Sequence, residues 1–333
     1  MRKVILTAIM SLLLANLGFA LETNATKKVL ISKVVDHPAL DATESGIIDA
    51  LAESGYIIND NIIIRTESAQ GNPVLANQIA IKFTYQNPNA VVAIGTISAQ
   101  SFIKFSRNNE VKMIFSSVTD PVEAGLMISS TTNEKNITGV SNFVAIGPQL
   151  ELFKKLQPNL KKLGIIYNPG ESNSISIVKE LEEIAPNYNI EVLTKVATRS
   201  SEVAQTAVSL AKNADAIFIS NDNMALSALQ NIIKAAVDAQ IPVYVSDTDA
   251  VKLGAVAALG PNQYNIGIQT GKMVARILNG SDINKEKVEL PEKNDLYLNT
   301  EAAKKANISI PKDLLEIADK IITPKQTKED ELS

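Results

Sequence analysis

Residues 114–125, IFSSVTDPVEAG, have a counterpart in residues 243–254, VYVSDTDAVKLG, and this duplication indicates the fold. Each copy begins with a short apolar run, which predicts a buried strand. Each continues with a Ser/Thr/Asp cluster, which predicts a turn from strand to helix. Pro121 directly after Asp120 is typical of a helix N-cap followed by proline at the first helical position. We therefore predict that Asp120 and its counterpart Asp249 are structural caps.

Two further pairs of strand ends repeat along the chain. Residues 91–96 (VVAIGT) match residues 216–221 (AIFISN), and residues 34–38 (VVDHP) match residues 165–169 (IIYNP). The offsets from His37 to Asn168, from Thr96 to Asp222 and from Ser117 to Ser246 are 131, 126 and 129 residues, so the chain consists of two similar halves. Strands that alternate with helices predict an α/β fold with a doubly wound parallel sheet in each half. Ligands of such sheets bind at the carboxyl ends of the strands, where each half has three polar turns.

The order of the segments predicts two lobes that exchange chain at three crossings. The crossings are expected near residues 139–142, 261–264 and 294–298. Long helices are expected at residues 224–239 and 267–278. The predicted organisation is an N-terminal lobe of residues 28–140 plus 263–292, a C-terminal lobe of residues 141–262 plus 293–322, and a charged tail at residues 323–333.

Composition excludes several classes of function. Hydrophobic residues make up 45% and charged residues 20% of the 333 residues, as in ordinary globular proteins. The formal net charge of −4, with no basic cluster, argues against nucleic acid as a partner. One histidine and no cysteine leave no disulfides, no thiolate metal ligands and few ways to build a catalytic centre. We predict a protein that is not an enzyme and that needs no metal or cofactor.

The first 20 residues resemble a secretory signal peptide. Arg2 and Lys3 precede an apolar stretch at residues 4–17, and small residues at Gly18 and Ala20 suit a cleavage site. The apolar stretch is short for a membrane anchor. Because the chain has no cysteine to carry a lipid, we expect a periplasmic protein that is not a lipoprotein.

The polar strand ends supply the candidate binding residues, although any one cluster could simply cap a helix. Free N–H groups at helix N-termini suit a carboxylate, and Ser or Thr hydroxyls add donors. Asp222 or Asp247 in the opposite half would accept an ammonium group. The pattern suggests a zwitterion such as an amino acid, and a peptide or a neutral polar solute would also fit. The candidates are His37, Thr96, Ser98, Ser117, Asn168, Glu171, Asp222, Ser246 and Asp247.

Several stretches resemble ABC-importer substrate-binding proteins of the periplasmic-binding-protein type I fold, in the branch that includes binders of tryptophan and other aromatic amino acids. They cover nearly the whole chain after the leader: residues 37–41 (HPALD), 118–122 (VTDPV), 136–140 (NITGV), 167–174 (YNPGESNS), 246–249 (SDTD), 254–255 (GA) and 267–271 (GIQTG). The chain departs from aromatic binders in having no tryptophan, and a complete amino-acid pocket cannot be matched.

The resemblance implies how the protein works. A ligand would lie between two lobes joined by three crossovers, and the loaded form would dock on a membrane permease as a monomer. The family's cleft positions correspond to the candidates named above, except Ser246. Glu171 and Asn173 fit a role as caps of the following helix equally well. A sensor of the same fold that feeds a membrane receptor is the alternative function.

Overall fold

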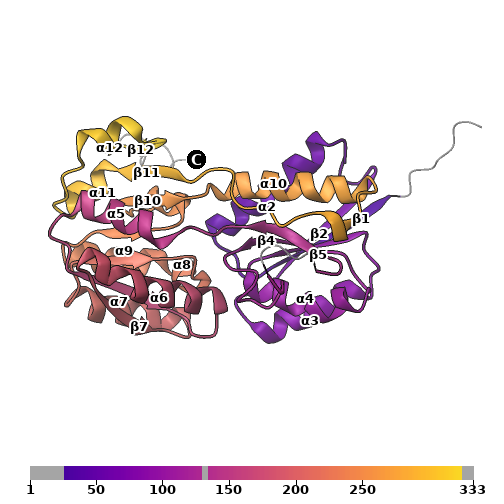
Figure 1. Ribbon diagram of the computed structural model, residues 1–333, viewed down its shortest axis with the longest axis horizontal. Coiled ribbons are helices and arrows are strands. Elements are labelled where there is room, and N and C mark those ends of the chain that lie inside the picture. The colour runs from indigo at the N-terminus through magenta and orange to yellow at the C-terminus, as the bar shows by residue number, and fades with distance from the viewer. Residues whose placement is uncertain (1–25, 130–133, 325–333) are drawn as a thin grey trace, which may run out of the picture.

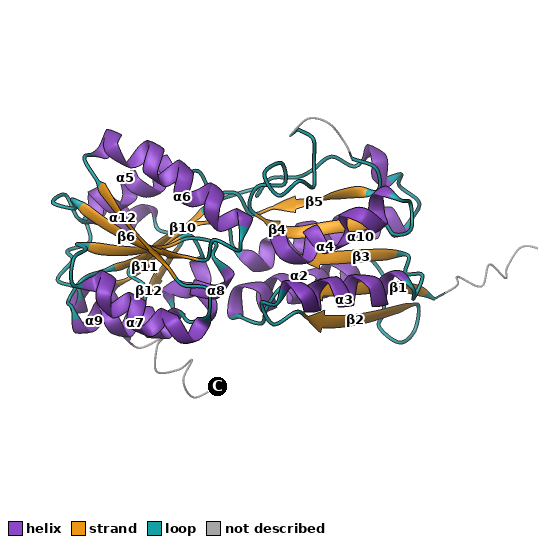
Figure 2. Cartoon of the chain, turned by 90° about the horizontal axis from the view of Figure 1, so that it is seen from below, coloured by secondary structure: helices purple, strands orange, loops and turns teal. Residues whose placement is uncertain are grey.

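The computed structural model describes residues 26–129 and 134–324, which form two α/β lobes side by side along the long axis of the molecule (Figures 1 and 2). The predicted signal peptide and nearly all of the predicted tail lie outside these residues. In the described ranges no helix combines the length and apolarity that crossing a membrane requires.

The first lobe is built on a five-stranded parallel sheet in the order β2-β1-β3-β4-β5. Helices cover both faces of this sheet (Figure 1). The strands are β1 (Lys27–Lys33), β2 (Ile62–Ser68), β3 (Ala90–Ile94), β4 (Met113–Val118) and β5 (Ile137–Ser141). The helices are α2 (Pro38–Glu53), α3 (Pro73–Thr84), α4 (Thr96–Arg107) and, from the end of the chain, α10 (Gln263–Leu278).

The second lobe is built on a seven-stranded sheet in the order β12-β11-β10-β9-β8-β6-β7. Its strands are β6 (Lys162–Tyr167), β7 (Glu191–Val196), β8 (Ala216–Ile219), β9 (Val243–Val245), β10 (Ala257–Gly260), β11 (Asp295–Asn299) and β12 (Lys320–Ile322). Only the pairing of β10 with β11 is antiparallel. The helices are α5 (Ile146–Leu156), α6 (Ser172–Ile184), α7 (Ser200–Ala211), α8 (Asn223–Ser227), α9 (Leu229–Asp238), α11 (Thr300–Lys305) and α12 (Lys312–Ile317). Short 3-10 helices are η1 (Ala185–Tyr188), η2 (Thr248–Val251) and η3 (Ile283–Lys285).

The duplication in the sequence becomes a duplication in topology. The orders β2-β1-β3-β4-β5 and β7-β6-β8-β9-β10 are the same when the strands of each lobe are numbered from its first. In both, the strand order reverses beside the first strand, and ligands of open α/β sheets bind at such a switch point. His37 and Thr96 follow the two strands at this point in the first lobe, and Asn168 and Asp222 do so in the second.

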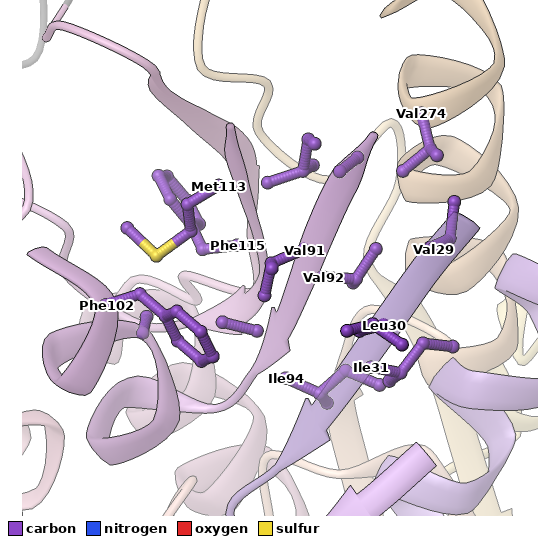
Figure 3. Close-up of a cluster of buried hydrophobic side chains, with 14 of the residues drawn as sticks. Val29, Leu30, Ile31, Val91, Val92, Ile94, Phe102, Met113, Phe115 and Val274 are labelled. Carbon is purple, nitrogen blue, oxygen red and sulfur yellow. The ribbon is translucent and has the colours of Figure 1, made fainter. Parts of the chain in front are cut away.

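The apolar runs of the sequence form strands whose side chains are covered by helices on both faces of the sheet. All five residues of β3 are buried, as expected for a central parallel strand. Figure 3 shows Val29, Val91 and their neighbours on the strands, with Phe102 of α4 and Val274 of α10 packed around them. Each such side chain contributes roughly 1.5–3 kcal/mol when fully buried. The second lobe has one apolar cluster on each face of its sheet, around Phe153 and around Ile232.

Three crossings connect the lobes. Residues 142–145 lead from β5 to α5, residues 261–262 lead from β10 to α10, and residues 290–294 lead back to β11. The first and third are joined by backbone bonds, since Ser141 N–H donates to Glu289 O at 2.9 Å and Glu289 N–H to Gly139 O at 2.9 Å. The third crossing therefore begins after Glu289, and the prediction of residues 294–298 is wrong, because residues 295–298 belong to β11.

Helix α10 lies unusually close to α2 because glycines face each other there. A Cβ on Gly267 would lie 2.1 Å from Thr43 O, and one on Gly46 would lie 2.2 Å from Tyr264 O. The helix predicted to begin at Gly267 in fact begins at Gln263, with Asn262 as its N-cap. This earlier start brings Gln263 to the space between the lobes.

Two other predictions of local structure are wrong. The predicted helix 224–239 is interrupted at Ala228, which separates α8 from α9. Pro121 opens a turn rather than a helix. Asp120 still acts as a cap there, because its Oδ1 accepts from the N–H groups of Val122 and Glu123 at 2.9 and 3.0 Å.

Candidate functional site

A small cavity lies between the lobes at the carboxyl ends of the strands. We call it the interlobe cavity. Its lining comes from both lobes and the first crossing: His37, Ala39, Leu40, Thr96, Ser117, Thr119, Asn142, Asn173, Asn221, Asn223, Leu226, Asp247 and Gln263. The volume open to the centre of a water molecule in this cavity is about 10 Å³. This is enough for about one water molecule. The two lobes are thus in contact around the cavity, for example through Gln100 Nε2, which donates to Ser172 Oγ at 3.3 Å, and most of the lining residues are polar.

The first lobe presents hydrogen-bond donors to the cavity. Thr96 is the first residue of α4, and Gly95 before it, at φ 87°, supplies no side-chain cap. The first-turn N–H groups of α4 therefore meet the cavity at the positive end of the helix. The hydroxyl of Thr119 donates to Asn142 Oδ1 at 3.2 Å.

Ser117 has a strained backbone in the same wall. Its φ of 54° is rare for a residue other than glycine, and it lies where the pairing of β4 with β5 shifts register. Its hydroxyl donates to Gln263 Oε1 at 2.9 Å. Strain of this kind costs about 1–3 kcal/mol and is typical of functional sites.

His37 precedes α2 and is 5% exposed. Burial lowers its pKa to about 4, although a hydrogen bond with Asn223 opposes this shift, so the ring is neutral at neutral pH. The loop that carries it is fixed by buried Lys33, whose Nζ lies 3.0 Å from Asp36, 2.6 Å from Asp41 and 2.9 Å from Glu44. Burial lowers the pKa of Lys33, but the three carboxylates outweigh burial and raise it overall.

The second lobe presents acceptors. Asn173 is 3% exposed, and its Oδ1 has no hydrogen-bond partner among the described residues. The buried carboxylate of Asp247 accepts from Asp249 N–H at 3.0 Å, and in the described ranges it forms no ion pair within 4 Å. Burial raises the pKa of Asp247, and the carboxylate of Asp249 adds to the rise. A buried carboxylate without a cation is costly, so a cationic group in the cavity would stabilise it.

The predicted roles of Asp247 and Asp249 are only partly right. Asp247, and not Asp249, is the N-cap of η2. Asp249 instead forms a 3.6 Å ion pair with Lys252 and leaves its Oδ2 without a hydrogen bond. Asp247 thus caps a helix with one oxygen while its side chain lines the cavity.

Asp222 and Glu171 are engaged inside the second lobe. Asp222, which we had not expected to be a cap, is the N-cap of α8 and also accepts from Asn168 N–H and Ser174 Oγ, both at 2.7 Å. Glu171 occupies the N-cap position of α6, but its side chain makes no capping hydrogen bond there. Its carboxylate accepts instead from the N–H groups of Asn223 and Met224 at the start of α8, both at 3.1 Å. Burial raises the pKa of both carboxyl groups.

The cavity brings together four of the nine candidates: His37, Thr96, Ser117 and Asp247. The other five do not line it: Ser98, Asn168, Glu171, Asp222 and Ser246. Ser98 accepts from Ser32 Oγ at 3.3 Å, and Ser246 donates to Gln149 Oε1 at 2.8 Å, so both hydroxyls point into their own lobes.

Sequence reasoning missed several lining residues. Thr119 lies within the duplicated stretch and Asn173 within residues 167–174, so a signal existed for both. Gln263 lies ahead of the predicted helix and gave no signal. Within the described ranges, no group of three or more His, Asp or Glu side chains could hold a metal ion.

Comparison with known proteins places this geometry in context. The family described as "ABC transporter substrate binding protein" matches residues 28–322. A protein named "Tyrosine-binding protein" from Clostridioides difficile is 34% identical over 283 residues, which are 85% of this chain and 81% of that protein.

Two solved structures are also similar. One, titled as an ABC domain in complex with L-Trp from Streptococcus pneumonia, is 28% identical with a TM-score of 0.85, over 90% of this chain and 100% of that one. The other is titled as the ligand-free, open structure of a substrate binding protein with adhesive properties from Clostridium difficile. It is 33% identical with a TM-score of 0.67, over 89% of this chain and 99% of that one.

Proposed function

The chain belongs to the ABC transporter substrate-binding protein family, and we propose that it captures a small zwitterionic ligand, an amino acid, between its lobes and delivers it to a membrane permease. The family consists of binding proteins rather than enzymes, which confirms that part of the sequence prediction. Its relatives include proteins described as amino-acid binders. The ligand of this chain, its periplasmic location and its permease are the proposed part.

The observation that carries the proposal is the opposite polarity of the two cavity walls. In the second lobe Asp247 and the unpartnered Oδ1 of Asn173 are acceptors that suit an ammonium group. In the first lobe the N-terminus of α4 and the hydroxyl of Thr96 are donors that suit a carboxylate, and the hydroxyl of Thr119, which donates to Asn142 Oδ1 here, would add a donor by turning to the ligand. An α-amino acid carries both groups and so could connect the two walls.

The lining includes a small apolar part that suits an apolar ligand side chain. Ala39, Leu40 and Leu226 are its apolar members, and it includes no Phe, Tyr or Trp. The relatives described with tyrosine and L-Trp support an aromatic ligand here too. With about 10 Å³ of free space, the cavity requires the lobes to move apart before any amino acid enters.

Comparison of lobe arrangements supports such a motion. The open, ligand-free relative has the higher identity, 33%, yet the lower TM-score, 0.67. The L-Trp complex has 28% identity and a TM-score of 0.85. The TM-score of a whole two-lobed chain falls when the angle between its lobes differs from that of the other structure. The lobe angle of this chain is therefore more like that of the L-Trp complex than that of the open relative. Our proposal therefore takes the present lobe arrangement as close to the closed one. Because its cavity has room for only about one water molecule, the ligand would favour a closed form in which the lining side chains give way to enlarge the cavity.

Calorimetric titration with L-tyrosine, L-tryptophan, L-leucine and L-isoleucine tests the proposal. At least one should bind, and its analogues lacking the amino group or the carboxylate should bind at least about 30-fold more weakly, as expected when a buried charge loses its partner. Equal binding of an analogue would contradict the zwitterion assignment. Mass spectrometry of co-purifying molecules would identify a ligand outside this panel.

Export and the transport role need separate tests. The mature protein should begin at or near Leu21 in the periplasmic fraction, and an intact Met1 there would contradict export through a cleaved leader. Loss of uptake of the bound amino acid on deletion of the gene supports transport. Unchanged uptake with a lost cellular response supports the sensor alternative.

A further inference from the structure

A chain of three buried side chains spans the interlobe cavity. Glu171 Oε2 accepts from Asn223 Nδ2 at 2.6 Å, and Asn223 Oδ1 lies 3.4 Å from His37 Nε2 in the other lobe. The three residues are 2%, 8% and 5% exposed. His37 and Asn223 line the cavity, whereas Glu171 lies behind Asn223 and does not.

Glu171 determines which way the amide of Asn223 points. Burial raises the pKa of Glu171 to about 7, and above this pH its carboxylate is ionised and only accepts hydrogen bonds. Its two oxygens receive the N–H groups of Asn223 and Met224 and the Nδ2 of Asn173, besides Asn223 Nδ2. Reversing the amide of Asn223 would put its oxygen against this carboxylate. Nδ2 is therefore held toward Glu171, and Oδ1 is held toward the other lobe.

The fixed amide in turn selects the tautomer of His37. The Oδ1 of Asn223 only accepts, so the hydrogen of the neutral ring must be on Nε2 for a bond to form. Because His37 belongs to the first lobe and Asn223 to the second, this bond exists only when the lobes are together.

We propose that Glu171 is a positioning residue for lobe closure: it orients Asn223 so that the Asn223 Oδ1–His37 Nε2 bond holds the closed arrangement. The inference rests on the proposed function, since closure is the step that encloses the ligand. The latch, defined as Glu171, Asn223 and His37, contributes to closure whether or not ligand is present.

Substitutions separate this role from a general effect on folding. His37→Gln keeps a side-chain N–H donor near the place of Nε2, whereas His37→Ala removes it. Glu171→Gln brings an NH₂ group among N–H donors and removes the constraint on the amide of Asn223. Ser176→Ala is the control, because Ser176 Oγ donates within α6 to Ser172 O and takes no part in the latch.

The ratio of closed to open molecules is the quantity to measure. The chain has no cysteine, so cysteines introduced at exposed positions in the two lobes, such as Tyr85 and Val208, are labelled uniquely. Spin-label distances then give the ratio for ligand-free protein and for protein with saturating L-tyrosine. We expect His37→Ala, Asn223→Ala and Glu171→Gln to lower the ratio about three- to tenfold, the value of one net hydrogen bond. His37→Gln and Ser176→Ala should leave it within about twofold.

A double variant tests whether Glu171 acts through Asn223. In an Asn223→Ala background, Glu171→Gln should lower the closed-to-open ratio no further. An additional loss, an unchanged ratio in His37→Ala, or a wild type with no closed population in either condition would overturn the inference. If L-tyrosine leaves every ratio unchanged while the variants differ as expected without it, the latch stands and tyrosine is not the ligand.

Discussion

The two copies of the duplicated stretch end in the same place and present opposite chemistry. In residues 114–125 the cavity receives the hydroxyls of Ser117 and Thr119, and Asp120 is a cap outside it. In residues 243–254 the hydroxyl of Ser246 turns away to Gln149, and Asp247 faces the cavity. The cavity residue of the second copy, Asp247, corresponds to Val118, one position from Ser117 and from Thr119. This shift by one position places hydroxyl groups in one wall and a carboxylate in the other. The repeat thus became a pair of complementary walls without a change in fold.

The largest expected effect comes from removing the anion. Asp247→Asn keeps a residue that caps η2 but removes the charge that would pair with an ammonium group, so binding should weaken by about 2–5 kcal/mol. Stability without ligand should hold or rise, since burial disfavours the ionised carboxylate. Calorimetry and thermal melts measure both quantities. Asp238→Asn, in an exposed pair with Lys234, is the control and should change neither. Undiminished binding in Asp247→Asn would show that the walls are not complementary in charge.

A smaller effect is expected in the donor wall. Thr119→Val removes a hydroxyl that would turn from Asn142 Oδ1 to the ligand carboxylate, and a hydrogen bond to a charged group contributes about 1.5–3 kcal/mol. The variant also loses the bond to Asn142, so thermal melts must accompany the titration. Ser101→Ala on α4, whose hydroxyl bonds within its own helix, is the matched control. A loss of stability without a loss of affinity would remove Thr119 from the binding wall.

The charge difference between the walls should also appear as a pH dependence. Burial and the carboxylate of Asp249 raise the folded-state pKa of Asp247 to about 7, so its carboxylate gains a proton as pH falls through about 7. Below the raised pKa, affinity should fall by up to about tenfold per pH unit. Asp249 and Lys252 are the nearby charges, and His37, with a pKa of about 4, titrates lower. Asp247→Asn should flatten the dependence; an equally steep profile in that variant would assign it to another group.

The smallest effects concern the two aspartates outside the cavity. Asp120→Ala should lower the free energy of unfolding by about 0.5–2 kcal/mol, because its Oδ1 caps two N–H groups. Asp249→Ala should cost about 0–1 kcal/mol, since it only forms a partly exposed ion pair with Lys252. Denaturant titration compares them. A larger cost for Asp249 would restore the cap that the sequence suggested.

The sequence predicted the repeated fold and the two sheet edges that face each other. It did not predict which polar residues line the cavity, which cap helices and which bond within their own lobe. Apolar strands and their polar ends are local signals, so His37, Thr96, Ser117 and Asp247 were found. The choice between Asp247 and Asp249 depends on where a short 3-10 helix begins, which neighbouring residues did not reveal. Glu171 finds its partners about 50 residues away at α8, and Gln263 reaches the cavity because α10 begins early, packed against Gly46 of α2. Contacts of this kind depend on tertiary packing, which local patterns do not encode.

Solution scattering tests the central claim, that the two walls close on a shared ligand, most directly. With an amino acid that calorimetry has shown to bind, the radius of gyration of the wild-type protein should fall at unchanged molecular mass, because only the closed arrangement completes contacts with both walls. A tightly bound amino acid that leaves the scattering curve unaltered would contradict the account and indicate a ligand held by one lobe or by a site that is closed beforehand.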